Sequence, residues 1–146
     1  TCLKLFLPPG AKHKVFKRGE TISFSIQWKA RKKLKDVLLR ISIRTINDFC
    51  IGSFMVPLSS NIEENEFLTK IGIDSKPFSS GDYYSTLAII QTDKSGNVVV
   101  LDQVSRIIHF RILENLSLQD SNVSWVPTNW GNIHFDKIVV ENKVNK

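Results

Sequence analysis

The sequence contains few of the residues from which metal centres, disulfide frameworks and phosphate-binding loops are built. Its 146 residues include two cysteines, three histidines that follow no ligand spacing, and seven glycines scattered at turn signals. Neither a G-x-S-x-G elbow nor the Cys–His pattern of a nucleophilic enzyme occurs in it. We therefore expect this chain to hold no metal and no cofactor, and not to be an enzyme.

Long apolar stretches are missing as well. No apolar run exceeds four residues, as at residues 98–101, whereas a membrane helix needs about 20. The first seven residues are too few and too polar for a signal peptide, and because the sequence starts with Thr1 rather than Met, we expect it to be a fragment of a larger protein. Cys2 and Cys50 are expected to be reduced thiols of a cytoplasmic protein rather than a disulfide.

The charge is unevenly distributed along the chain. The net charge is +6, and residues 1–73 contain 13 Lys and Arg against 6 Asp and Glu, whereas residues 74–146 contain 7 against 8. A partner of the first half would therefore be anionic: nucleic acid, anionic lipid or an acidic sugar. The densest basic cluster, at residues 29–35, lacks the interleaved aromatic residues of a nucleic-acid site. We interpret it as a solvated hairpin loop and expect no nucleic-acid partner.

What the sequence does have is a hydrophobic period of two. Ile22, Phe24, Ile26 and Trp28 alternate with polar residues, which predicts a strand with one face in a core and the other in water. The same alternation occurs at residues 39–44, 83–90 and 107–112, and shorter strands are expected at residues 4–7, 49–55, 67–73, 97–101 and 122–126. The expected core contains Ile22, Phe24, Ile26, Tyr83, Leu87 and Phe110.

Turn signals separate these runs, among them Pro8-Pro9-Gly10 and a hairpin signal at residues 94–97. Eight or nine short antiparallel strands at this spacing predict an all-β sandwich or barrel. Sustained helical periodicity is absent, although residues 59–66 could form one helical turn. We assign residues 1–131 to the β-domain and residues 132–146 to a C-terminal extension with room for a further strand before a frayed tail.

The polar face of the sheet is the candidate binding surface. Sugars are bound by a flat aromatic ring and planar polar side chains on a rigid surface. The polar phase of the expected strands offers Tyr84, Arg44, His109, Arg111, Arg40 and Thr86. Tyr84 is expected to point outward and to stack on a pyranose ring, while the arginines bind hydroxyls or carboxylates. The alternatives are an ordinary solvated sheet face, or a Tyr84 that packs against a second subunit.

Three segments resemble one known family. They are FKRGE at residues 16–20, which leads into the alternating strand, FSSGDYY at residues 78–84, and VSWVPTNW at residues 123–130. In this order they resemble the C-terminal substrate-binding domain of the ATP-binding subunit of polysaccharide ABC exporters, the Wzt type that handles O-antigen. The resemblance extends from about residue 2 to residue 130, and the basic segment and the C-terminal extension depart from it.

The resemblance implies an immunoglobulin-like sandwich that binds a finished O-antigen glycan in the cytoplasm, at the inner face of the bacterial inner membrane, before export. It also implies an ATPase domain upstream, a transmembrane exporter subunit as partner, and a homodimer in which a terminal strand crosses between subunits. Two other hypotheses stay open. One is an immunoglobulin-like dimerisation or docking domain with no glycan site, and the other is a small glycan-active hydrolase that uses two turn aspartates across a cleft.

Overall fold

The structure, a computed structural model, describes residues 3–6, 14–115 and 127–133. The described chain forms eight strands and one short helix. The elements are β1 (Leu3–Phe6), β2 (Lys14–Lys17), β3 (Thr21–Ala30), β4 (Leu34–Thr45), β5 (Cys50–Ile62), β6 (Asn65–Asp74), β7 (Gly81–Thr92), β8 (Val98–Leu113) and α1 (Pro127–Trp130). The prediction of an all-β fold with about eight or nine strands is confirmed.

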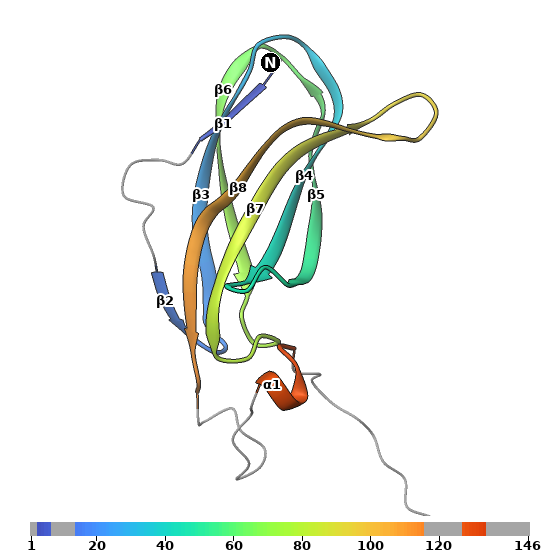
Figure 1. Cartoon of the computed structure of the whole chain (residues 1–146). Coiled ribbons are helices and arrows are strands. Elements are labelled where there is room, and N and C mark those ends of the chain that lie inside the picture. Colours follow the sequence, from blue (N-terminus) through green and yellow to red (C-terminus); the bar gives the residue numbers. More distant parts are fainter. Residues whose placement is uncertain (1–2, 7–13, 116–126, 134–146) are drawn as a thin grey trace, which may run out of the picture.

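The strands form two facing sheets (Figure 1). The first has three strands in the order β1-β3-β6, and the second has five in the order β2-β8-β7-β4-β5. Every pair is antiparallel except β2 with β8, which is parallel, so the prediction of a purely antiparallel sandwich is wrong at this edge. Alternation of polar and apolar residues carries no information about strand direction. β2 continues through a short turn into β3 of the other sheet, so no hairpin forces it to run antiparallel to β8.

The core lies between the two sheets and is built from the inward phase of each strand. Along β3 every second residue from Ile22 to Ala30 is buried, as the alternation predicts. All six expected core residues are buried, and Trp28 stacks on Phe67 of β6 with ring centroids 4.3 Å apart. Its indole N–H donates to Thr69 Oγ1 at 3.0 Å, which satisfies the one polar atom that its burial removes from water.

Two of the connections at one end of the sandwich cross between the sheets. Residues 31–33 link β3 to β4, and residues 63–64 link β5 to β6 (Figure 1). The basic segment is therefore a crossing connection rather than a hairpin loop, although it is solvated as expected, and two of its lysines form ion pairs. Lys29 Nζ lies 2.9 Å from Glu66 Oε1, and Lys33 Nζ lies 2.6 Å from Glu63 Oε1.

Residues 59–66 are not helical. They complete β5 and begin β6, because pairing with β4 and β3 satisfies their backbone groups. The hairpin predicted at residues 94–97 joins β7 to β8, with Thr92 opposite Val98 and Gly96 at a φ of 84°. The two strands predicted at residues 97–101 and 107–112 are one strand, β8, interrupted by a bulge. The strand predicted at residues 122–126 lies outside the described residues, as does Cys2.

Candidate functional site

A polar depression lies on the outer face of the five-stranded sheet, on the side away from the core. It encloses about 280 Å³. Its lining comes from β4, β7, β8 and the turn after β4: Arg40, Ser42, Arg44, Asp48, Tyr84, Thr86, Gln103, Ser105 and Arg106. Four of the six residues predicted from the sequence are among them, namely Arg40, Arg44, Tyr84 and Thr86.

Strand register brings these residues together. Arg44 of β4 lies opposite Tyr84 of β7, which lies opposite His109 of β8. One pleat further along, Ser42 lies opposite Thr86. Since successive side chains of a strand point to opposite faces, Arg40, Ser42 and Arg44 share the outer face while Ile41 and Ile43 enter the core.

Tyr84 has the predicted strand phase but not the predicted exposure. Tyr83 belongs to the core cluster and Tyr84 does not, yet only 2% of the surface of Tyr84 is exposed. The Arg106 guanidinium carbon lies 4.6 Å from the centre of the Tyr84 ring, and the His109 ring is 5.9 Å away. The expectation that Tyr84 offers a free face for a sugar to stack on is therefore wrong, and so is the alternative in which a second subunit covers it. Its own chain already covers it.

A bulge in β8 places Arg106 over this ring. Ser85 pairs with Ile108 and Leu87 pairs with Val104, so the single residue Thr86 faces three residues of β8. Arg106, the middle one, has a φ of 53° in the left-handed region, which costs a residue other than glycine about 1–3 kcal/mol. Bulges of this kind redirect a side chain next to binding sites. An alternating pattern does not reveal the extra residues of a bulge. For this reason Arg106 was not predicted as a site residue from the sequence.

Asp48 connects the rim of the depression to Tyr84. Its carboxylate accepts hydrogen bonds from the Tyr84 hydroxyl and, at 3.1 Å, from Arg44 Nη1, which also donates to the Asp48 carbonyl at 2.8 Å. The bond from Tyr84 is the main cause that lowers the pKa of Asp48, and the positive charges of Arg44 and Arg106 add to it. The same bond is the main cause that raises the pKa of Tyr84. Asp48 is therefore an ionised acceptor beside a protonated phenol.

The remaining lining consists of Arg40 and a set of neutral hydrogen-bonding groups. Arg40 Nη2 donates to Gln103 Oε1 at 3.1 Å, and the hydroxyls of Ser42 and Ser53 are 2.8 Å apart. Hydroxyl groups of Thr86 and Ser105 complete the floor. Amides and hydroxyls both donate and accept, so this surface matches the hydroxyls of a sugar without demanding one orientation.

Two predicted residues lie beside the depression rather than in it. Arg111 forms a bidentate ion pair with Asp82, at 2.7 and 2.8 Å, and its charge is thereby already engaged. His109 contacts the ring of Tyr84 and does not line the depression. Both lie on the correct face, because the phase of β8 is correct beyond the bulge.

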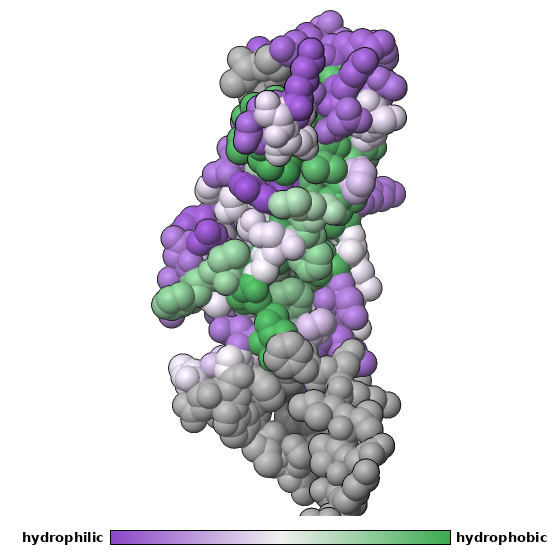
Figure 2. All heavy atoms as spheres, turned by 90° about the vertical axis from the view of Figure 1, so that its right-hand side faces the viewer, coloured by the Kyte–Doolittle hydropathy of each residue, from purple (hydrophilic) through white to green (hydrophobic). Residues whose placement is uncertain are grey.

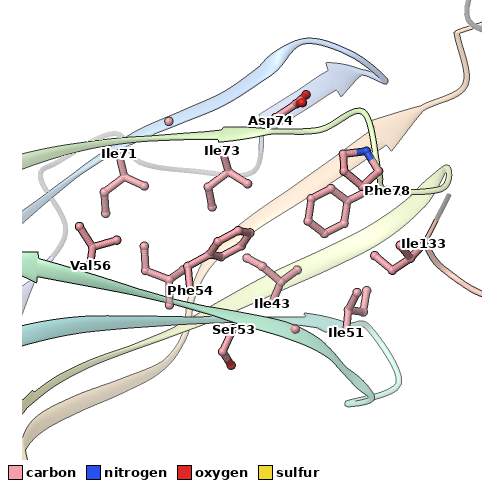
Figure 3. Close-up of a pocket in the computed structure, with 14 residues that line it drawn as sticks. Ile43, Ile51, Ser53, Phe54, Val56, Ile71, Ile73, Asp74, Phe78 and Ile133 are labelled. Atoms are coloured by element: carbon pink, nitrogen blue, oxygen red, sulfur yellow. The ribbon is translucent and has the colours of Figure 1, made fainter. Parts of the chain in front are cut away.

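A second hollow is apolar and lies between the sheet edges β5 and β6. It encloses about 420 Å³ (Figure 3). Ile71 and Ile73 of β6 face Phe54 and Val56 of β5 across it, with Phe78 and Ile133 at one end (Figure 3). Figure 2 shows an apolar band along this side of the molecule. The hollow offers contact area to an apolar surface and few partners for a hydroxyl-rich glycan.

Neither a metal cluster nor a membrane helix is found in the described parts of the chain. Within residues 3–6, 14–115 and 127–133, no three His, Cys, Asp or Glu side chains gather closely enough to hold a metal ion. In those same ranges no helix is long and apolar enough to cross a bilayer. Cys50 is an exposed free thiol.

Comparisons with known proteins agree with this fold. The model of the Wzt C-terminal domain family matches residues 3–125. The crystal structure of the C-terminal domain of Wzt is similar over 96% of this chain and 81% of that one, with a TM-score of 0.62 and 13% identity. A family 123 glycoside hydrolase from Clostridium perfringens is similar over 79% of this chain but only 28% of its own, with a TM-score of 0.50 and 13% identity. No curated protein matches the chain.

Proposed function

The chain belongs to the Wzt C-terminal domain family, a family of domains from ABC-type polysaccharide export, and from this premise we propose that it binds the exported polysaccharide. Binding occurs in the polar depression on the outer face of the five-stranded sheet. The observation that supports this is the convergence there of arginines, hydroxyls, an amide and a carboxylate on a rigid face whose register the antiparallel pairs fix. Sugar sites are built from such preformed sets of directed polar groups.

In this proposal the domain recognises the glycan and performs no chemistry on it. The family is a non-catalytic one, and Asp48 is the single carboxylate among the residues that line the depression. Hydrolysis of a glycosidic bond needs two carboxyl groups on either side of it. The likeness to the glycoside hydrolase, at 13% identity, concerns the fold alone.

The family relation also supports the setting of this binding event. We place the domain with an ATPase domain and a transmembrane exporter subunit, at the cytoplasmic face of the bacterial inner membrane, as part of a homodimer. The glycan in this proposal is an O-antigen. Recognition at this point couples the finished polymer to the transporter that exports it.

Isothermal titration calorimetry with the polysaccharide exported by the source cells tests the proposal. The variant Thr86→Trp fills the floor of the depression and is expected to abolish the binding heat. Its matched control is Lys70→Trp, which places the same ring on the exposed outer face of the three-stranded sheet, opposite Ser25. Equal binding by wild type and Thr86→Trp would move the site elsewhere on the domain.

A docking function without a glycan site is the second candidate, and the apolar edge supports it. β5 carries no charged residue in 13 positions, and Phe54, Met55 and Val56 on it are 41%, 59% and 44% exposed. An edge strand of this kind pairs readily with another chain. If the domain shows no binding to the polysaccharide while Met55→Lys reduces its molar mass in light scattering, docking is its function instead.

A further inference from the structure

The polar depression carries an excess of positive charge that its own side chains do not neutralise. Three arginines line it, Arg40, Arg44 and Arg106, against one acid, Asp48. A neutral sugar needs hydroxyls, amides and carboxylates, and it gives no reason to hold guanidinium groups together against their mutual repulsion. The charge itself therefore points to the ligand.

Two of the three arginines that line the depression have no acidic partner among the described residues. Elsewhere in the molecule Arg18 is bonded to Glu114 at 3.3 Å, and Arg111 is bonded to Asp82. Within the depression Arg44 is bonded to Asp48. Among the ion pairs of the described residues, none involves Arg40 or Arg106. Arg40 donates to the neutral amide of Gln103, and Arg106 lies over a ring.

The position of Arg106 is fixed at a cost in backbone strain. Its left-handed φ of 53° holds the guanidinium over Tyr84, and the ring in turn is held by Asp48. A guanidinium that rests on an aromatic face keeps the N–H groups on its edge free to donate. Strain of this kind persists where the surrounding structure has a use for it. The bulge therefore presents a preoriented donor fork to the depression.

We infer that the depression selects glycans that carry an anionic group, a carboxylate or a phosphate, and that Arg40 and Arg106 bind this group. The inference rests on the proposed function and adds the class of ligand. A guanidinium forks to either anion through two parallel N–H···O bonds. The hydroxyls of Ser42, Thr86 and Ser105 then bind the sugar that bears it, and Asp48 accepts from a sugar hydroxyl while repelling a misplaced anion.

The experiment compares three size-matched forms of the polysaccharide exported by the source cells, titrated into the 146-residue chain. The first is native, the second has its carboxyl groups reduced to alcohols, and the third has its phosphate esters removed with cold hydrofluoric acid. We expect one of the two treatments to weaken binding about tenfold or more, as loss of a charge-assisted contact does. The treatment that does so identifies the anion.

Two results overturn the inference, and they differ in what they say of the proposed function. If the native polymer binds and both treated forms bind within about twofold of it, selection for an anion is wrong while glycan binding stands. If the native polymer does not bind, the proposed function fails and the inference fails with it.

Variants tie the selectivity to the two arginines. Arg106→Gln and Arg40→Gln are expected to bind the native polymer about tenfold more weakly while binding the treated polymer unchanged. Arg106→Lys keeps the positive charge but lacks the two parallel N–H donors of the guanidinium. It should therefore bind the native polymer more tightly than Arg106→Gln and more weakly than the wild type. Lys70→Gln removes the same charge from the other sheet and controls for net charge. Equal losses for Lys70→Gln and Arg106→Gln would show a nonspecific charge effect and overturn the inference.

Discussion

The polar depression and the apolar hollow between β5 and β6 share strand β4 and have opposite linings. Arg40, Ser42 and Arg44 face the depression, while Ile41 and Ile43 face the hollow and the core. The two environments are therefore one residue apart along the chain. The difference shows that β4 fixes two separate properties at once: its inward phase contributes to stability, and its outward phase supplies donors to a ligand.

The largest expected effect on the free energy of unfolding comes from truncating a side chain that points into the core. Ile41 is 1% exposed, so Ile41→Ala should lower the free energy of unfolding by about 2–5 kcal/mol, and Phe24→Ala, on the opposing sheet, by about 3–5 kcal/mol. Ser42→Ala, the neighbour on the outer face, should cost about 1 kcal/mol or less. Urea unfolding measures all three. If Ile41→Ala lowered the free energy of unfolding less than Ser42→Ala does, Ile41 would lie on the outer face and Ser42 in the core, which contradicts the structure.

A smaller effect concerns the hydrogen bond between Tyr84 and Asp48, and it depends on pH. The pKa of Asp48 is lowered, so its contribution to stability is present above its unfolded value and is lost as pH falls through the folded value. The pKa of Tyr84 is raised, so its contribution is present below its unfolded value and is lost as pH rises through the folded one. The Tm difference between wild type and Tyr84→Phe should be constant between about pH 5 and pH 9 and shrink outside this range.

Titration of the two tyrosines of the chain sharpens the comparison of the two faces independently of the stability measurements. Burial is the main cause that raises the pKa of Tyr83 on the core face, and the bond to Asp48 is the main cause at Tyr84 on the outer face. Absorbance at alkaline pH should therefore show neither ionising at the ordinary value of about 10. Asp48→Asn should return one of them toward that value and leave the other. If both shift together, the two sites are coupled.

The smallest effect is expected at Cys50, where β5 begins. Its thiol is exposed and free. Alkylation of the native protein should add one group at this residue, located by peptide mass, with no change in circular dichroism. Resistance of Cys50 to the reagent until the chain is unfolded would place this end of β5 in an interface instead.

Much of the fold could be predicted because alternation encodes which face of a strand is buried. The inward positions of β3, β4 and β7 were correct, and Tyr83 and Tyr84 were assigned to opposite faces. What alternation does not encode is pairing partner, strand direction or an inserted residue. The parallel pair of β2 and β8, the crossing connection at residues 31–33 and the bulge at Arg106 are all of this kind.

The candidate site could likewise be predicted only in the part that strand alternation determines. Arg40, Arg44 and Thr86 lie on the strands with unbroken alternation, and the sequence placed them correctly in the depression. Tyr84 was expected to be exposed because nothing in its own strand covers it. The side chains that bury it come from the β8 bulge and from the turn that contains Asp48, both distant in sequence. Whether these residues bind a glycan is what the calorimetry decides.

Because of the bulge in β8, substitutions that change ligand preference need not change the stability of the core. Val104 and Ile108 flank it and are paired with β7, and of the three residues between them Ser105 and Arg106 are exposed while Ile107 packs against the core. Homologous domains could therefore exchange the two exposed residues and acquire a new ligand preference with the core unaltered. A library randomised at Ser105 and Arg106 alone would be the smallest one in which to look for domains that bind a different ligand.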